Sequence, residues 1–175
     1  MKIVILLGVG LLAVWGLLWV GSRIPVRHRH LNPAKLLNLL YTLLHNGSDG
    51  SILVVTVRGD GRFTQFRLRM PPGGEPSLEF GFPRAPWSAA VFDDVADMLR
   101  AHGRSFERVP AQVGAVTEFL LADFEADVAG AQQITTALLT DVYGVVPERD
   151  CYATLEGDFS SRAVAARKQR VPITG

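Results

Sequence analysis

The chain is poor in the residues and motifs that build most catalytic centres. It has a single cysteine, Cys151, so no disulfide forms within the chain and nothing requires an oxidising compartment. The spacings Gly-x-x-x-x-Gly-Lys, Gly-x-Gly-x-x-Gly, Gly-x-Ser-x-Gly and His-Glu-x-x-His are all missing, which removes the common signatures of phosphate, dinucleotide, serine-hydrolase and zinc-protease sites. The sequence therefore predicts a protein that is not an enzyme and has no cofactor.

A strong excess of one charge is also missing. Eighteen Lys and Arg against 17 Asp and Glu give a formal net charge of +1, without the basic field of a nucleic-acid-binding protein, so no nucleic-acid partner is expected. The acidic triplet Asp93, Asp94 and Asp97 has helical spacing, and we interpret it as a solvated helix face because no further oxygen ligand accompanies it. The histidines lack the neighbours of a metal shell, so no metal is expected; they are His28, His30, His45 and His102.

Charge is almost absent from the first 22 residues. No side chain from Ile3 to Ser22 is charged, and twenty helical residues span about 30 Å, the thickness of a bilayer's hydrocarbon core. The run is longer than the apolar part of a cleaved signal peptide, so residues 1–22 are predicted to form a transmembrane anchor and residues 23–31 a basic collar. The expected membrane-interface residues are Trp15, Trp19, Arg23, Arg27 and Arg29. The arginines after the span predict that residues 23–175 face the cytoplasm.

Helix and strand patterns alternate along the remaining chain. Asn32-Pro33 predicts the start of a leucine-rich helix that ends at Gly47. The further elements expected are strands at 52–57, 63–70 and 77–82, a helix at 86–102, strands at 105–109 and 116–122, and a helix at 123–143. Residues 145–175 are predicted to be an extension with a basic tail and are not assigned to the core.

This order predicts the fold class. It is an α+β fold in which one N-terminal transmembrane helix precedes an α-β-β-β-α-β-β-α domain, residues 32–144, with a mainly antiparallel sheet. The order of elements from Asn32 to Gly144 resembles the fold of the class I type III secretion chaperones and of the YbjN-like proteins. The resemblance implies a sheet packed on helices that binds proteins and has no catalytic apparatus.

We therefore expect a non-catalytic, membrane-anchored interaction protein, acting as an accessory, assembly or scaffolding subunit of a larger membrane complex. Its expected partners are membrane lipid and other proteins, and a homodimer is also considered. The residues expected at the partner surface are Leu36, Leu40, Leu43 and Trp87. Two other functions stay open at this point: a membrane-anchored sensor of a ligand or peptide, and an enzyme whose site is assembled from scattered residues. Candidates for that site are Asp93, Asp94, His102 and Cys151.

Overall fold

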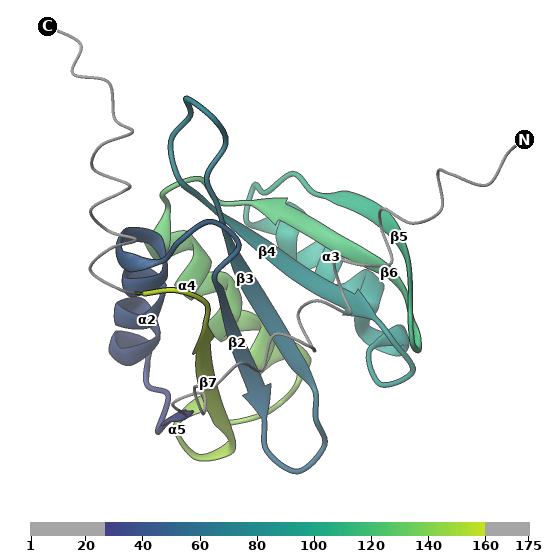
Figure 1. The fold of residues 1–175 in the computed structure, drawn as a ribbon. Helices are drawn as coiled ribbons and strands as arrows, with labels where there is room; N and C mark the ends of the chain where they lie inside the picture. Colours follow the sequence, from purple (N-terminus) through teal and green to yellow (C-terminus); the bar gives the residue numbers. More distant parts are fainter. Residues whose placement is uncertain (1–26, 160–175) are drawn as a thin grey trace, which may run out of the picture.

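Two strands at the middle of the sheet show buried residues that alternate with more exposed ones, whereas β4 (Ser77–Arg84) is buried at six successive positions. In β2 (Ile52–Val57) and β3 (Phe63–Arg69) every second side chain is buried, as expected when one face of a sheet packs on the core. The other strands are β1 (Arg27–Arg29), β4 (Ser77–Arg84), β5 (Glu107–Val113), β6 (Val116–Asp123) and β7 (Cys151–Glu156). The computed structural model, which describes residues 27–159, orders these strands β1-β7-β2-β3-β4-β6-β5 in one antiparallel sheet (Figure 1).

Three helices pack on one face of this sheet. They are α2 (Pro33–Asn46), α3 (Phe92–Ala101) and α4 (Val128–Ala137), and a single helical turn, α5 (Pro147–Asp150), leads into β7. The start of α2 is capped by Asn32, whose side chain accepts a hydrogen bond from the backbone N–H of Lys35 at 2.8 Å. Figure 1 shows α3 and α4 behind the strands and α2 beside α4, so the described chain forms two layers.

The core lies between the helices and the face of the sheet that they cover. At its centre are three fully buried phenylalanines: Phe66 of β3, Phe80 of β4 and Phe124, which follows β6. The ring of Phe66 lies 5.4 Å from that of Phe80 and 5.7 Å from that of Phe124, both in edge-to-face arrangement, which is a favourable geometry for aromatic pairs. On the helix side, the buried leucines of α2 are Leu36, Leu39, Leu40, Leu43 and Leu44.

From α2 to α4 the structure has the order of elements expected from the sequence, and the α+β class agrees with it. The sheet nevertheless extends beyond the predicted boundaries at residues 31 and 144. Arg27–Arg29, expected in a basic collar, pairs with β7, and β7 itself lies between β1 and β2. Residues 151–156 were not assigned to the core and form an inner strand, because a short strand pattern does not reveal a pairing partner about a hundred residues away in the chain.

No helix within residues 27–159 is long and apolar enough to cross a membrane. The longest helix described, α2, has 14 residues and spans about 21 Å, against about 30 Å for the hydrocarbon core of a bilayer. This finding contradicts the predicted single-pass membrane architecture and the membrane location inferred from it. The span predicted over residues 1–22 and its interface residues Trp15, Trp19 and Arg23 lie outside the described residues.

Candidate functional site

The face of the sheet opposite the helices carries no helix of the described chain, and we call it the open face. Two neighbouring rows of side chains cross it, as the strand register shows. The apolar row consists of Thr154, Val54, Gln65, Gly81 and Leu121, and the charged row consists of Ile52, Arg67, Glu79 and Asp123. Val54, Gln65 and Leu121 are partly exposed, whereas their sequence neighbours Leu53 and Phe66 on the other face are fully buried.

Gly81 keeps the middle of the open face flat. A Cβ atom at this position would lie 3.2 Å from Cγ and 3.2 Å from Nε2 of Gln65, so the space that a side chain would take is already occupied by Gln65. Val54 lies on one side of this pair and Leu121 on the other. The result is a flat strip across β2, β3, β4 and β6, with the apolar side chains of Val54 and Leu121 at its two ends and Gln65 between them, which we call the apolar strip.

The charged row centres on Glu79, whose side chain is only 11 % exposed. Its Oε2 lies 2.5 Å from Nη1 of Arg69, and its Oε1 lies 3.8 Å from Nε of Arg67. The hydrogen bond to Glu79 raises the pKa of Arg69, and the nearby carboxylates of Asp123 and Asp49 raise it further. Both arginines therefore lie beside a largely covered carboxylate.

A cleft of about 410 Å³ opens at the end of the charged row, where the β3–β4 hairpin leaves the sheet, and we call it the acidic cleft. Its lining residues are Asp49, Arg69, Met70, Pro71, Pro72, Ser77 and Asp123. Asp49 accepts a hydrogen bond from the backbone N–H of Met70 at 2.8 Å, and Asp123 accepts one from that of Glu125 at 2.7 Å. Within the described chain, neither carboxylate has a cation within 4.0 Å. At this end of the charged row three carboxylates, those of Asp49, Asp123 and Glu79, therefore face two arginines, and the local charge is negative.

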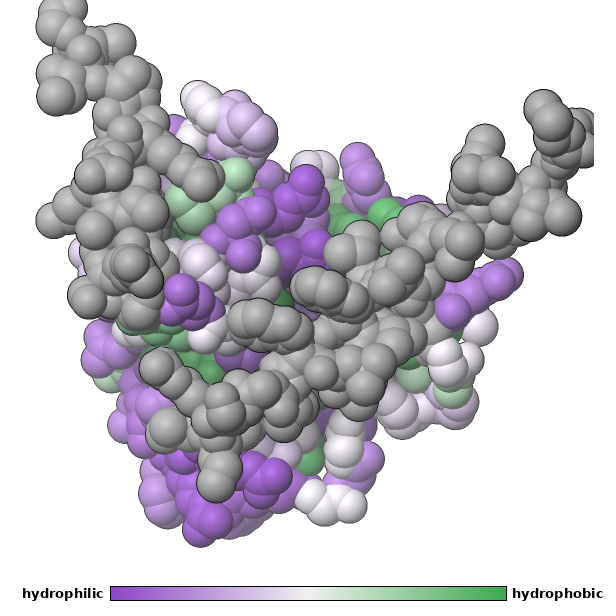
Figure 2. Space-filling model, in the orientation of Figure 1, coloured by the Kyte–Doolittle hydropathy of each residue, from purple (hydrophilic) through white to green (hydrophobic). Residues whose placement is uncertain are grey.

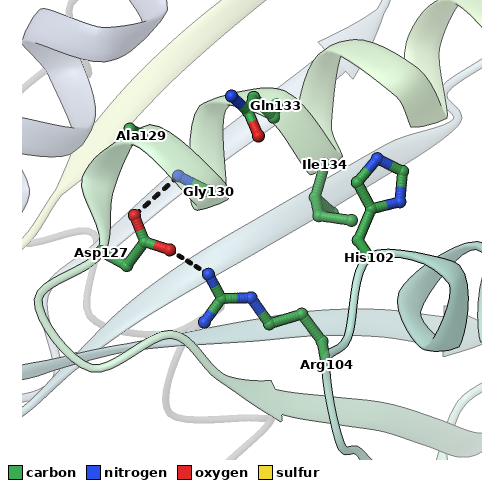
Figure 3. Close-up of a pocket in the computed structure, with 7 residues that line it drawn as sticks. All are labelled: His102, Arg104, Asp127, Ala129, Gly130, Gln133 and Ile134. Carbon is green, nitrogen blue, oxygen red and sulfur yellow. Dashed lines mark hydrogen bonds and ion pairs between the residues drawn. The ribbon is translucent and has the colours of Figure 1, made fainter.

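A second, smaller hollow of about 170 Å³ lies at the start of α4 (Figure 3). Asp127 caps this helix by accepting a hydrogen bond from the backbone N–H of Gly130 at 2.9 Å, and it also forms an ion pair with Arg104. Figure 3 shows His102 on the far side of the hollow from Asp127. The volume is below the roughly 300 Å³ at which ligand pockets usually begin, so we assign this hollow a structural role, the capping of α4.

Replacing Asp127 by alanine should lower the free energy of unfolding by about 1 kcal/mol, because the backbone N–H of Gly130 loses its partner. Urea denaturation at pH 7 measures this loss. Asp127→Asn is the matched control, since asparagine keeps the acceptor and loses only the charge. Equal stability of Asp127→Ala and the parent chain would contradict the assigned role.

The same carboxylate predicts a pH dependence. The hydrogen bond from Gly130 lowers the pKa of Asp127 most, Arg104 lowers it further, and partial burial acts against both. A carboxylate with a lowered pKa in the folded state stabilises the fold above its unfolded pKa, about 3.9, and this contribution is lost as the pH falls toward the folded value. The Asp127→Asn variant should therefore lose less stability than the parent chain on acidification below pH 4.

The leucines expected at a partner surface lie inside the core. Leu36 is 2 % exposed, and Leu40 and Leu43 are fully buried. The apolar residues that α2 does present to solvent are Leu37 and Tyr41, which are 39 % and 57 % exposed. At 3.6 residues per turn, Leu37 and Tyr41 lie at the margin of the buried leucine face of α2. The leucine-rich pattern does not show where the buried face ends.

Trp87 is partly buried and lies apart from the leucines of α2. Its ring packs on Phe63 at 5.4 Å and edge-to-face on Phe82 at 6.1 Å, so it covers one end of strands β3 and β4. The two described arginines expected at the membrane interface lie in β1. The guanidinium of Arg27 stacks 5.0 Å from the ring centre of Tyr152, and the carbonyl of Arg29 accepts a hydrogen bond from Lys35 Nζ.

The four residues considered for an assembled catalytic site have separate surroundings. Asp93 pairs with Arg108 at 2.7 Å, and Nδ1 of His102 is hydrogen-bonded to the carbonyl of Met98 at 2.9 Å. Cys151 is fully buried at the start of β7, and burial raises the pKa of its thiol to about 11. Asp94 is exposed on α3.

The apolar strip of the open face was not recognised in the sequence, although a signal for it is present. Ile52 to Val57 is apolar at nearly every position, a pattern typical of a strand buried on both faces. In the structure only Leu53, Val55 and Val57 are buried. An apolar residue on the uncovered side of a strand is the sequence feature that points to this surface.

Comparison with known proteins leaves the fold and site to be interpreted from the chain itself. The chain matches no family model, no curated protein and no solved structure. The resemblance to the type III secretion chaperones and YbjN-like proteins therefore stays a prediction.

Proposed function

We propose that this protein is a non-catalytic interaction module that binds another protein through the open face of its sheet. The observation that carries the proposal is the apolar strip of Val54 and Leu121, which is partly exposed and adjoins the charged row of Arg67 and Glu79. Partly exposed apolar side chains next to polar and charged ones are a common composition of a protein–protein interface.

The shape of the open face also favours a macromolecule. Gln65 fills the space above Gly81, so the centre of the strip offers a flat surface instead of an enclosed cavity. Small ligands bind mainly in concave pockets, whereas proteins associate over broad and fairly flat surfaces.

The β5 edge of the sheet is a poor template for the addition of a strand, which favours binding on the face. β5 forms one edge of the sheet and contains Pro110, which has no backbone N–H to donate to a further strand. The pairing of β5 with β6 is also irregular between Pro110 and Val113. Both features weaken this edge as a template for a partner strand.

We expect Val54→Arg and Leu121→Arg each to reduce recovery of the bound partner about tenfold or more, because each places a charge in the centre of the interface. The measurement is purification of the full chain at its native level, followed by quantitative mass spectrometry of what remains bound. Gln133→Arg is the matched control, since it adds the same charge at an exposed position of α4 in the helix layer.

Two results would overturn the proposed function. One is recovery of the parent chain without any stoichiometric protein. The other is equal recovery of the partner with Val54→Arg, Leu121→Arg and Gln133→Arg, which would place the interface elsewhere. Thermal melts of all three variants establish that the fold is retained.

A further inference from the structure

The described chain ends beside the acidic cleft. The carbonyl of Asp158 accepts a hydrogen bond from the backbone N–H of Ser48 at 3.0 Å. Gly157 packs so closely on Ser51 that a Cβ atom there would lie 2.8 Å from Ser51 Cα. Ser48 and Ser51 flank Asp49, whose carboxylate lines the cleft. The chain is therefore held one loop away from the cleft at the point where the described residues end.

The residues that follow Phe159 carry the positive charge that would complement the carboxylates of the cleft. Residues 160–175 contain no Asp or Glu, and their cations are Arg162, Arg167, Lys168 and Arg170. In the cleft, Asp49 and Asp123 have no cation within 4.0 Å among the described residues, and the guanidinium of Arg69 is already engaged by Glu79. Side chains with a positive charge complement this arrangement.

The segment from residue 160 to residue 175 is long enough to reach the acidic cleft. An extended chain spans at most about 3.6 Å per residue, so residue 162 lies within about 11 Å of Phe159 and residue 170 within about 40 Å. A segment tethered this closely has an effective concentration in the millimolar range, which makes its own chain the favoured occupant over a free peptide.

We propose that the basic segment 162–170 of this same chain occupies the acidic cleft at the end of the open face. By covering this end, the segment competes with the partner and lowers its affinity, a regulatory consequence that rests on the proposed function. Binding of the segment itself needs no partner and is tested on the purified chain alone.

The experiment is disulfide trapping in the full chain. Ser77→Cys places a thiol in the lining of the cleft, and Gln169→Cys places one in the segment while all four of its cations are kept. The matched control pairs Gln169→Cys with Asn46→Cys, because Asn46 is exposed at the end of α2, next to the loop that holds Asp158, and lies outside the cleft. The native thiol of Cys151 is fully buried, and the Gln169→Cys chain alone measures any reaction with it.

We expect the cleft pair to close about tenfold faster than the control pair at low ionic strength, because docking adds to the effect of the tether. The difference should vanish at 1 M salt, where the Debye length is about 3 Å, and when the four cations are replaced by glutamine. Equal rates of disulfide formation for the two pairs would overturn the proposal. A rate for the cleft pair that does not change with salt or with loss of the four cations would also overturn it. Cross-links that form only between chains would also overturn it and assign the cleft to the segment of a second copy.

Discussion

Phe80→Ala is expected to lower the free energy of unfolding by about 3–5 kcal/mol, the range found when a buried phenylalanine is truncated and its cavity stays open. Phe80 lies in β4 between two paired strands, and its side chain is fully buried. Its ring lies 5.4 Å from that of Phe66 and 6.3 Å from that of Phe124. Phe66 is held in β3, and the backbone N–H of Phe124 donates a hydrogen bond to the carbonyl of Leu78 in β4 at 2.8 Å, so collapse of either residue into the vacated space is restricted.

Urea denaturation monitored by circular dichroism measures the loss, provided that the dependence on urea concentration is unchanged. Phe119→Ala is the matched control, because Phe119 is partly exposed on the open face of β6 and its truncation leaves no enclosed cavity. We expect it to cost less than half as much as Phe80→Ala. Similar losses for the two variants would mean that the aromatic cluster is not the centre of the core.

Leu40→Ala is expected to cost about 2–5 kcal/mol, whereas Leu37→Ala should change the free energy of unfolding by about 0.5 kcal/mol or less. The two residues lie three positions apart on the same helix and differ in burial. Leu40 is fully buried in the core, and Leu37 is 39 % exposed. Comparing the stability losses of the two variants therefore tests where the buried face of α2 ends.

Thermal and urea unfolding of both variants provide the measurement. The outcome that contradicts the structure is an unchanged stability of Leu40→Ala, since a leucine that serves only a partner surface is solvated in the free protein. In that case the expectation of a partner surface at Leu36, Leu40 and Leu43 would be restored. A large loss for Leu37→Ala would indicate a different orientation of the helix.

The order of elements was predictable because its signals are local. Asn32-Pro33 combines a capping side chain with a proline at the first helical position. In the structure the side chain of Asn32 accepts a hydrogen bond from the backbone N–H of Lys35. The alternation from Phe63 to Arg69 has the period of a strand. Such signals depend on neighbours a few residues away in the chain, so they can be recognised without knowledge of the fold.

The candidate site was not predictable in the same way. The sequence directed attention to the leucines of α2 and to Trp87, because large apolar residues mark both cores and interfaces. The structure buries the former under the sheet and packs the latter on Phe63 and Phe82. The open face is identified by the position of the helices on one side of the strands, which Figure 1 shows; Figure 2 gives the hydropathy of the atoms visible in the same view.

By itself, the sequence determined the order of helices and strands from α2 to α4, the α+β class, and the absence of familiar catalytic motifs. Only the tertiary structure decided that β7 lies inside the sheet, that α2 turns its leucines inward, and that Asp49 and Asp123 meet at one cleft. The physical reason is the range of the interactions involved. Capping and periodicity act within a few residues, whereas strand pairing and the choice of a buried face depend on the summed burial of apolar surface from distant parts of the chain.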